Sequence, residues 1–192
     1  SNIAAAVKAK LIKTVQTMKM GTVEDFSNFV NAVIDEKSFN NIAKYIDRAK
    51  KDTKAKILVG GNYSKKDGYF VEPTVIEVSD PKYVTMCEEI FGPVLSILTF
   101  DTADEALEIA NNTEFGLSAG VWTKDIDTAM IMTRNIEAGT VWVNNWMSGY
   151  PEIPFGGMKQ SGIGRELGPG AIDEFMETKS VLIKTGKSSN WV

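Results

Sequence analysis

Histidine is absent from this 192-residue chain, and cysteine occurs once, as Cys87. Histidine is the commonest metal ligand and general base near neutral pH. The sequence therefore argues against a zinc site, and it excludes a self-contained Ser-His-Asp or Cys-His catalytic centre. One cysteine permits no internal disulfide, which fits a reducing compartment. Catalysis would rest on carboxylates, lysines, a cofactor or residues upstream of this chain.

Long hydrophobic runs are also absent, since none approaches the ~20 residues that a membrane span needs. The beginning of the sequence shows no signal-peptide pattern, so we expect a cytoplasmic protein with no membrane partner. A net charge of -4 argues against a nucleic-acid partner. Hydrophobic residues at 43% and charged residues at 24% are typical of a soluble globular protein.

Two amphipathic helices are predicted near the beginning of the chain. Apolar residues recur at helical spacing across residues 3–18, with Ser1 or Asn2 available as the N-cap. A second apolar stripe runs across residues 39–49, and Ser38 is the predicted cap of that helix.

Strands follow these helices. Residues 57–59 form a short apolar run closed by two glycines, which predicts a buried strand. Residues 69–78 alternate in hydrophobicity around Pro73. Proline removes a backbone donor, so we expect this strand to lie at a sheet edge or to bend at Pro73.

From Val94 onward the sequence alternates strands with helices. Thr102 and Glu105 predict a capping box in which each side chain accepts from the other residue's backbone amide. Short links between strands and helices favour parallel pairing with right-handed crossovers, and hence an α/β fold with a mostly parallel sheet flanked by helices. The predicted elements are strands at 94–100, 119–122, 140–143 and 180–184, helices beginning at Thr102 and at Asp125 or Asp127, and a helical turn at 171–176.

Two peptides carry the functional information. The first is Glu-Glu-Ile-Phe-Gly-Pro-Val at residues 88–94, and the second is Pro-Phe-Gly-Gly-Met-Lys-Gln-Ser-Gly-Ile-Gly-Arg-Glu at residues 154–166. Taken alone, the first could be a strand-entry loop and the second a flexible glycine loop. The second lacks the flanking strand and helix of a dinucleotide fingerprint. Together the two peptides resemble the aldehyde dehydrogenase superfamily, across essentially the whole chain.

The resemblance implies NAD or NADP as cofactor and assigns two residues to it. Glu89 would accept hydrogen bonds from the hydroxyls of the nicotinamide-side ribose, for which a carboxylate is a suitable acceptor. Phe91 would pack near the nicotinamide, and Gly92-Pro93 would supply the turn that presents both side chains.

On the substrate side, the resemblance places Phe155 in the aldehyde tunnel and makes Trp146 and Tyr150 candidates for the pocket wall. Aromatic faces there would suit a cationic aldehyde, while packing in the core is the alternative for these rings. Lys159 and Glu166 resemble a pair on a suspected proton path, and a structural salt bridge is the alternative account of that pair.

The resemblance differs between parts of the chain. Residues 20–100 are most similar to the 1-pyrroline-5-carboxylate dehydrogenase branch, and residues 101–183 are more similar to the betaine-aldehyde and aminoaldehyde branch. Residues 146–153 do not match the carboxylate anchor of the former branch. A chimera or a divergent member would each explain this.

Cys87 lies directly before the first peptide, whereas the resemblance places the family's nucleophile farther upstream. No lysine or arginine directly precedes Cys87 to lower its thiol pKa, so we do not expect it to be catalytic. We therefore expect the C-terminal part of an aldehyde dehydrogenase, inactive alone. A partial catalytic domain would span residues 1–178, and an oligomerisation strand and tail residues 179–192.

The expected partners are an aldehyde (a semialdehyde or an aminoaldehyde), the missing N-terminal part of the same enzyme, and further copies of the chain. The alternative function is a stand-alone structural or partner-binding module, such as one piece of a split enzyme, whose final strand adds to the edge of another chain's sheet.

Overall fold

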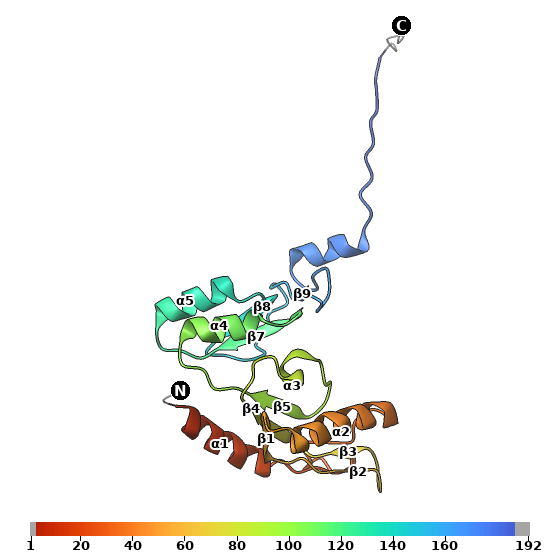
Figure 1. Cartoon of the computed structure of the whole chain (residues 1–192). Helices are drawn as coiled ribbons and strands as arrows, with labels where there is room; N and C mark the ends of the chain where they lie inside the picture. The colour runs from red at the N-terminus through yellow and green to blue at the C-terminus, as the bar shows by residue number, and fades with distance from the viewer. Residues whose placement is uncertain (1–2, 187–192) are drawn as a thin grey trace. The chain divides into compact units, whose positions relative to one another are not determined.

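The computed structural model describes residues 3–186, and the chain divides into two compact units (Figure 1). The first unit ends at Glu114 and the second begins at Phe115. The boundary predicted at residue 178 stays a prediction. No helix within the described residues is long and apolar enough to cross a membrane.

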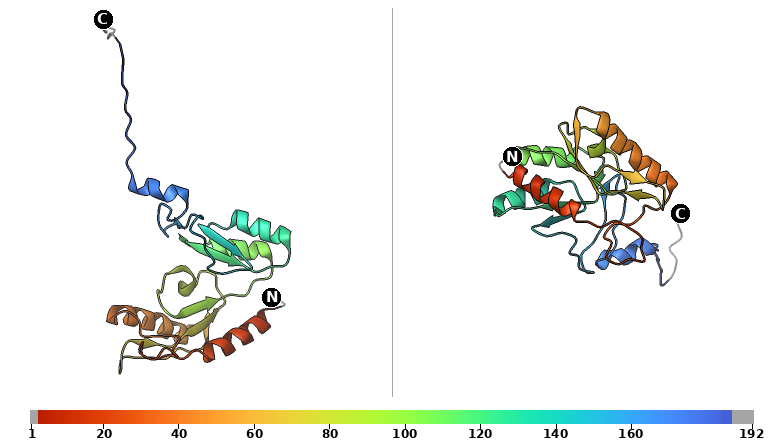
Figure 2. Two further views of the ribbon diagram at one scale, coloured as in Figure 1. Left: turned by 180° about the vertical axis from the view of Figure 1, so that it is seen from behind. Right: turned by 90° about the horizontal axis from the view of Figure 1, so that it is seen from below.

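The first unit combines helices with a small mixed sheet. In chain order its elements are α1 (Ala4–Gln16), α2 (Glu36–Lys51), β1 (Ala55–Val59), β2 (Tyr63–Ser64), β3 (Phe70–Val71), β4 (Thr74–Val78), α3 (Val84–Cys87), β5 (Val94–Ile97) and α4 (Ala103–Asn111). The strand order is β1-β4-β5, with β1 antiparallel and β5 parallel to β4. Both α1 and α2 contact β1 (Figure 2).

Pro73 separates two strands. The segment predicted as one strand across residues 69–78 bends there, because β3 pairs with β2 while β4 becomes the central strand of the other sheet. Of the two places predicted for this proline, the bend is confirmed and the sheet edge is not. The Pro73 carbonyl lies only 2.2 Å from where a Cβ on Gly60 would be, and Gly60 has a φ of +76°. Glycine is therefore required where β1 ends, because any side chain on Gly60 would collide with the Pro73 carbonyl.

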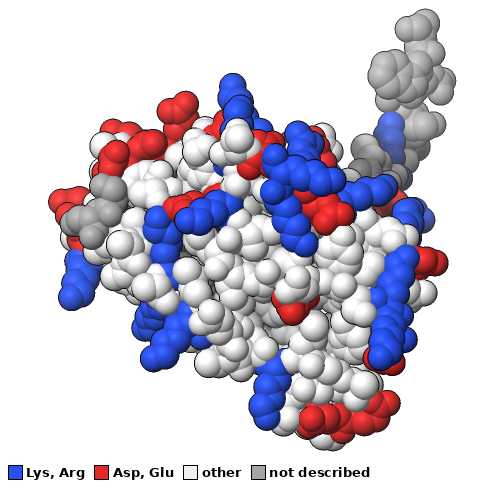
Figure 3. Space-filling view, turned by 60° about the horizontal axis from the view of Figure 1, so that its bottom comes forward, with Lys and Arg blue, Asp and Glu red and all other residues white. Residues whose placement is uncertain are grey.

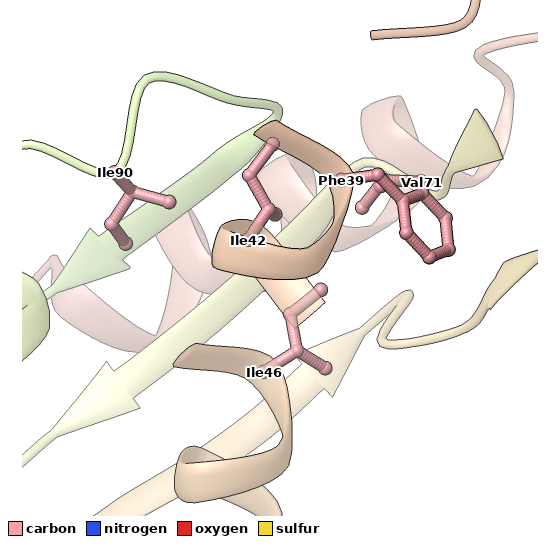
Figure 4. Packing of buried hydrophobic residues seen from close by; sticks show 5 residues of the cluster. All are labelled: Phe39, Ile42, Ile46, Val71 and Ile90. Carbon is pink, nitrogen blue, oxygen red and sulfur yellow. The ribbon is translucent and has the colours of Figure 1, made fainter. Parts of the chain in front are cut away.

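The core of the first unit is built on one face of α2. Phe39, Ile42 and Ile46 project from successive turns of the helix toward Val71 and Ile90 (Figure 4). Ile42 and Ile46 are completely buried. The predicted apolar stripe is thus confirmed, because its members supply this cluster.

The predicted cap of α2 is wrong. Asp35 is the N-cap, and its Oδ1 accepts a hydrogen bond from the Ser38 amide at 2.7 Å. Ser38 lies three residues into the helix, where its amide is one of the donors that a cap must satisfy. The predicted caps of the first helix, Ser1 and Asn2, lie outside the described residues.

Of the two hydrogen bonds predicted for the capping box of α4, one is confirmed and the other has a different donor. Thr102 Oγ1 accepts from the Glu105 amide at 3.1 Å, which confirms the hydroxyl cap. The Glu105 carboxylate, however, accepts from the amide of Asp101 at 2.8 Å instead of that of Thr102. The carboxylate reaches one residue farther back, so it satisfies a donor just before the helix.

The second unit holds the remaining elements. They are β6 (Phe115–Gly116), β7 (Ser118–Val121), α5 (Ile126–Asn135), β8 (Thr140–Val143), β9 (Met158–Lys159) and a 3₁₀ helix, η1 (Pro169–Phe175). β7 and β8 pair in parallel, as the strand–helix–strand pattern predicts, and β6 pairs antiparallel with β9. Asp125 caps α5 by accepting from the Thr128 amide at 2.9 Å.

The final strand predicted at residues 180–184 does not form within the described part of the chain. Residues 180–184 are exposed and belong to no sheet of the described residues. A strand needs a partner to satisfy its backbone groups, so its pairing with another subunit stays a prediction.

On the face shown in Figure 3, lysine and arginine side chains are interspersed with acidic ones.

Ile46→Ala should lower the free energy of unfolding by about 2–5 kcal/mol, because it leaves a cavity in a fully buried site. Urea unfolding followed by far-UV circular dichroism tests this, since every tryptophan lies after Glu114 and its fluorescence reports the second unit. The control is Val23→Ala at a residue that is 65% exposed. It should change stability by less than about 0.5 kcal/mol, and equal losses in both variants would contradict the account.

Candidate active site

The first candidate region is the turn from Glu88 to Pro93, called here the Glu88–Pro93 turn, which leads from α3 into β5. Ile90 is 9% exposed and joins the core cluster of α2, whereas Phe91 is 82% exposed. The Glu89 side chain is exposed as well. Inward packing of Ile90 thus turns its two neighbours outward, and these are the two predicted cofactor residues.

Gly92 packs directly on α2. A Cβ at this position would lie 2.4 Å from Cδ1 of Ile42, so only glycine permits this approach without a shift of the helix or the turn. Phe91 just before it has a φ of +55°, which is uncommon for a residue with a side chain. The turn then enters the sheet through a hydrogen bond of 2.9 Å from the Thr74 amide to the Pro93 carbonyl.

A second contact from α2 reaches the other end of the turn. The Tyr45 hydroxyl donates to Oε2 of Glu88 at 2.5 Å. This hydrogen bond to a carboxylate is the main reason that the pKa of Tyr45 is raised above its ordinary value, with smaller contributions from burial and the Glu88 charge. Tyr45 could not be found from the sequence alone, because nothing in the spacing of Tyr45 and Glu88 indicates their contact.

The turn borders a groove of ≈ 940 Å³ in the first unit. Glu89, Ile90 and Phe91 line one part of it, and the beginning of α2 with the preceding residues lines the rest. Polar side chains of α2, including Asn40, Asn41 and Lys44, also face the groove. The groove has the volume of a small-molecule site, and most of the residues that line it are polar or charged.

Cys87 closes α3 and is partly buried. Its Sγ lies 3.8 Å from the Pro81 carbonyl oxygen, a contact that a protonated thiol can make as a weak donor. It is not among the residues that line the groove.

In the second unit, the segment after β8 folds back over that strand. Asn144 has a φ of +52°, and its side-chain amide both accepts from the Thr123 amide at 2.9 Å and donates to the Thr123 carbonyl at 2.7 Å. Trp142 Nε1 donates to the Ser148 carbonyl at 2.8 Å. The ring of Trp146 packs against that of Trp142 with centroids 5.2 Å apart.

A pocket of ≈ 330 Å³ lies beside this segment. Of the three predicted substrate residues, Tyr150 and Phe155 line it, whereas Trp146 does not. None of the lining side chains is charged; they are Thr140, Val141, Trp142, Val143, Asn145, Ser148, Gly149, Tyr150, Ile153, Pro154, Phe155 and Leu167. The structure therefore brings two of the three residues to one apolar, partly aromatic pocket.

The glycine-rich loop that follows is folded on itself. Phe155 and Glu166 exchange two backbone hydrogen bonds, each of 2.7 Å. Arg165 Nη1 lies inside the loop and donates to the carbonyls of Gly157 at 2.9 Å and Gly164 at 2.6 Å. No sequence pattern indicates this role of Arg165, because its partners are backbone atoms whose positions depend on the folded loop.

The predicted proton-path pair, Lys159 and Glu166, is differently arranged. Lys159 Nζ forms an ion pair of 2.5 Å with Glu137, which joins β9 to the segment after α5. Glu166 takes part in the bridge with Phe155 through its backbone, and its side chain is exposed. Within residues 3–186, no group of three or more Cys, Asp or Glu side chains could hold a metal ion.

A model of the aldehyde dehydrogenase family matches residues 1–181. The chain belongs to this family. Among similar proteins, the "aldehyde dehydrogenase, cytosolic 2" of Macroscelides proboscideus is 44% identical over 158 residues, which are 82% of this chain and 65% of that protein. Human retinaldehyde dehydrogenase 3 is 45% identical over 154 residues, 80% of this chain and 30% of that protein.

Solved structures of other aldehyde dehydrogenases share the fold of this chain. Betaine aldehyde dehydrogenase of Staphylococcus aureus, solved with NAD+, has a TM-score of 0.84 at 37% identity and covers 91% of this chain and 35% of that one. A variant of the P. syringae indole-3-acetaldehyde dehydrogenase, solved with NAD+ and IAA, has a TM-score of 0.89 at 40% identity, covering 96% and 37%. The predicted α/β fold of the family is thus confirmed. This aldehyde dehydrogenase chain spans about a third of the length of most of these relatives.

Gly139→Ala should destabilise the second unit by about 1–3 kcal/mol or more, because the new Cβ would lie 1.6 Å from the Gly156 carbonyl oxygen and force the loop away from β8. Gly149→Ala is the matched control, since nothing lies within 4 Å of its Cβ position. Tryptophan fluorescence during urea unfolding measures both. Similar midpoints for the two variants would show that the loop does not pack as described.

Proposed function

We propose that this chain supplies the cofactor-contacting turn and one wall of the substrate pocket of an NAD(P)-dependent aldehyde dehydrogenase. The observation that carries the proposal is the outward presentation of Glu89 and Phe91 beside a groove, while Ile90 between them is buried. A family motif alone does not require this alternation. The structure of the S. aureus relative with NAD+ supports the choice of cofactor.

The chain's own residues would bind and orient the cofactor. The Glu89 carboxylate would accept hydrogen bonds from two neighbouring ribose hydroxyls, and the Phe91 ring would pack on the nicotinamide and limit its rotation. When bound, the cofactor would accept a hydride from the aldehyde carbon. Fixing the ring in one orientation contributes to such a transfer by lowering the entropy lost on reaching the transition state.

We propose that the nucleophile and the general base come from residues outside this chain. The chain has no histidine, and its one cysteine forms a weak contact with a backbone carbonyl and lies outside the groove and pocket linings. In the chemistry proposed for the whole enzyme, a cysteine thiolate would attack the aldehyde to form a thiohemiacetal, which would become a thioester by losing a hydride to NAD(P)+. A base-activated water would then hydrolyse the thioester and release the thiolate. The proposed site of action is cytosolic, as the name of the Macroscelides relative indicates for that protein.

The proposed substrate is an aldehyde whose far end carries no carboxylate. No lysine or arginine lines the pocket of Tyr150 and Phe155, so a carboxylate would lose its hydration there without gaining a charged partner. An aromatic wall accepts an apolar tail or, through its π-faces, an ammonium group. This favours the aminoaldehyde branch over the 1-pyrroline-5-carboxylate branch. Trp146 does not line the pocket, but its ring packs against that of Trp142, which does.

Two finer assignments complete the proposal. The ion pair between Lys159 and Glu137 favours a structural role for Lys159 over a proton path shared with Glu166.

The segment 180–184 suits pairing with the sheet of another subunit, since Val181, Leu182 and Ile183 are each more than half exposed. The same segment supports the second candidate, in which the chain acts as a partner-binding module or one piece of a split enzyme.

The purified chain should show no aldehyde-dependent NADH formation alone, and should gain it when joined to a polypeptide that carries the family's cysteine segment. In the joined enzyme, Glu89→Gln should raise the KM for NAD+ roughly ten-fold, because a charged acceptor for two hydroxyls is lost. Asp67→Asn, at an exposed loop residue, is the control. Turnover by the chain alone would contradict the proposal, and so would an unchanged KM in Glu89→Gln.

In the joined enzyme, kcat/KM for aldehydes of similar length should depend on the charge at the end of the chain farthest from the aldehyde group. We expect kcat/KM for 4-aminobutanal and for pentanal to exceed that for succinic semialdehyde by at least about ten-fold, the cost of leaving a buried carboxylate without a partner. Steady-state kinetics at one ionic strength measures the series. Preference for the semialdehyde would refute the assignment of this pocket to the substrate tail.

A further inference from the structure

We propose that Tyr45 is a positioning residue for the cofactor: its hydroxyl, acting with Ile42 one turn earlier on α2, holds the Glu88–Pro93 turn so that Glu89 and Phe91 face the groove. This inference rests on the proposed function, because it assumes that those two residues contact the cofactor. Nothing in the family motif itself includes Tyr45, which lies 43 residues before Glu88 in the sequence.

The two adjacent glutamates of the turn have different surroundings. The Glu88 carboxylate accepts a hydrogen bond of 2.5 Å from the Tyr45 hydroxyl. Among the described residues, no hydrogen bond or ion pair of the Glu89 carboxylate is present. Tyr45 thus fixes one carboxylate beside the turn and leaves its neighbour available to a ligand.

Along the turn, residues that contact α2 alternate with residues whose side chains face the groove. Glu88 is bound by Tyr45, Ile90 is buried in the α2 cluster, and Gly92 packs on Ile42. Glu89 and Phe91 lie between these three anchors. The φ of +55° at Phe91 costs about 1–2 kcal/mol for a residue with a side chain. Such a conformation persists only where its surroundings impose it, which the anchors on both sides do.

One helix face supplies the contacts at both ends of the turn. Ile42 and Tyr45 are three residues apart on α2, so their side chains lie on the same face. The Tyr45 ring also packs against the buried cluster, which limits the positions that its hydroxyl can adopt. The spacing between the two ends of the turn is therefore set by a single rigid element.

This arrangement has a pH dependence of known sign. The pKa of Tyr45 is raised above its ordinary value, first by the hydrogen bond to Glu88 and further by burial and the Glu88 charge, while the Arg48 charge opposes these effects. The protonated tyrosine is the donor, so the contact is fully present below the ordinary tyrosine pKa of about 10. It is lost as the pH rises through the higher pKa of the folded state.

The test is Tyr45→Phe in the whole chain, with Tyr63→Phe as the matched control. Tyr63 packs against the same cluster, but its hydroxyl donates to the Asp47 carboxylate of α2 at 2.8 Å and not to a residue of the turn. Hydrogen exchange measured by mass spectrometry at neutral pH should show about three- to ten-fold faster exchange in residues 88–94 for Tyr45→Phe alone. No change there, or the same change in both variants, would overturn the proposal.

Variants of Glu88 test whether the Tyr45–Glu88 hydrogen bond itself holds the turn, or whether Tyr45→Phe only destabilises the first unit. Glu88→Gln keeps an acceptor oxygen and should retain most of the protection, whereas Glu88→Ala should lose as much as Tyr45→Phe. The double variant Tyr45→Phe/Glu88→Ala should be no worse than either single one, because both remove the same contact. Additive losses would contradict the proposal.

The functional readout uses the joined enzyme. Tyr45→Phe should raise the KM for NAD+ about three- to ten-fold and leave kcat within about two-fold, and Glu88→Gln should restore most of the binding lost in Glu88→Ala. An unchanged KM alongside faster exchange would also overturn the positioning role. If the wild-type joined enzyme shows no dependence on NAD+, the proposed function fails instead, and the exchange experiment still decides whether Tyr45 holds the turn.

Discussion

The packing of one face of α2 against the Glu88–Pro93 turn is the constraint on which the first unit depends. Ile42 contributes twice, since it is fully buried in the core and also lies where any side chain on Gly92 would be. Stability and site geometry are therefore coupled: the contacts that exclude water from the core also set the direction of Glu89 and Phe91. Close-packed interiors transmit small displacements, so changes in this core will reach the turn.

In the second unit, the conformation of the glycine-rich loop is held mainly by hydrogen bonds. Its glycine-rich segment buries little apolar surface, and it relies instead on hydrogen bonds from Arg165 to backbone carbonyls and on the reciprocal bonds of Phe155 and Glu166. Close contact between Gly139 and the Gly156 carbonyl fixes the loop beside the beginning of β8. The glycines are thus required by close approach of backbone to backbone, and the position of Phe155 at the pocket follows from it.

Much of the local structure could be predicted from the sequence, because local patterns determine it. The apolar stripe of α2, the caps at Thr102 and Asp125, and the bend at Pro73 each depend on a few neighbouring residues. Long-range contacts could not be predicted in this way. The bond from Tyr45 to Glu88 and the ion pair from Lys159 to Glu137 depend on how separate elements pack, and one sequence does not contain the geometry of that packing. The misassigned cap at Ser38 shows the usual uncertainty of helix ends by a few residues.

The most direct test of the account is a crystal structure of the joined enzyme with NAD+. The account predicts both ribose hydroxyls within about 2.5–3.0 Å of the Glu89 carboxylate oxygens, the Phe91 ring against the nicotinamide, and Glu88 still bound to Tyr45. A cofactor bound with its ribose away from Glu89, or a Glu88 side chain turned from Tyr45 toward the ribose, would contradict it.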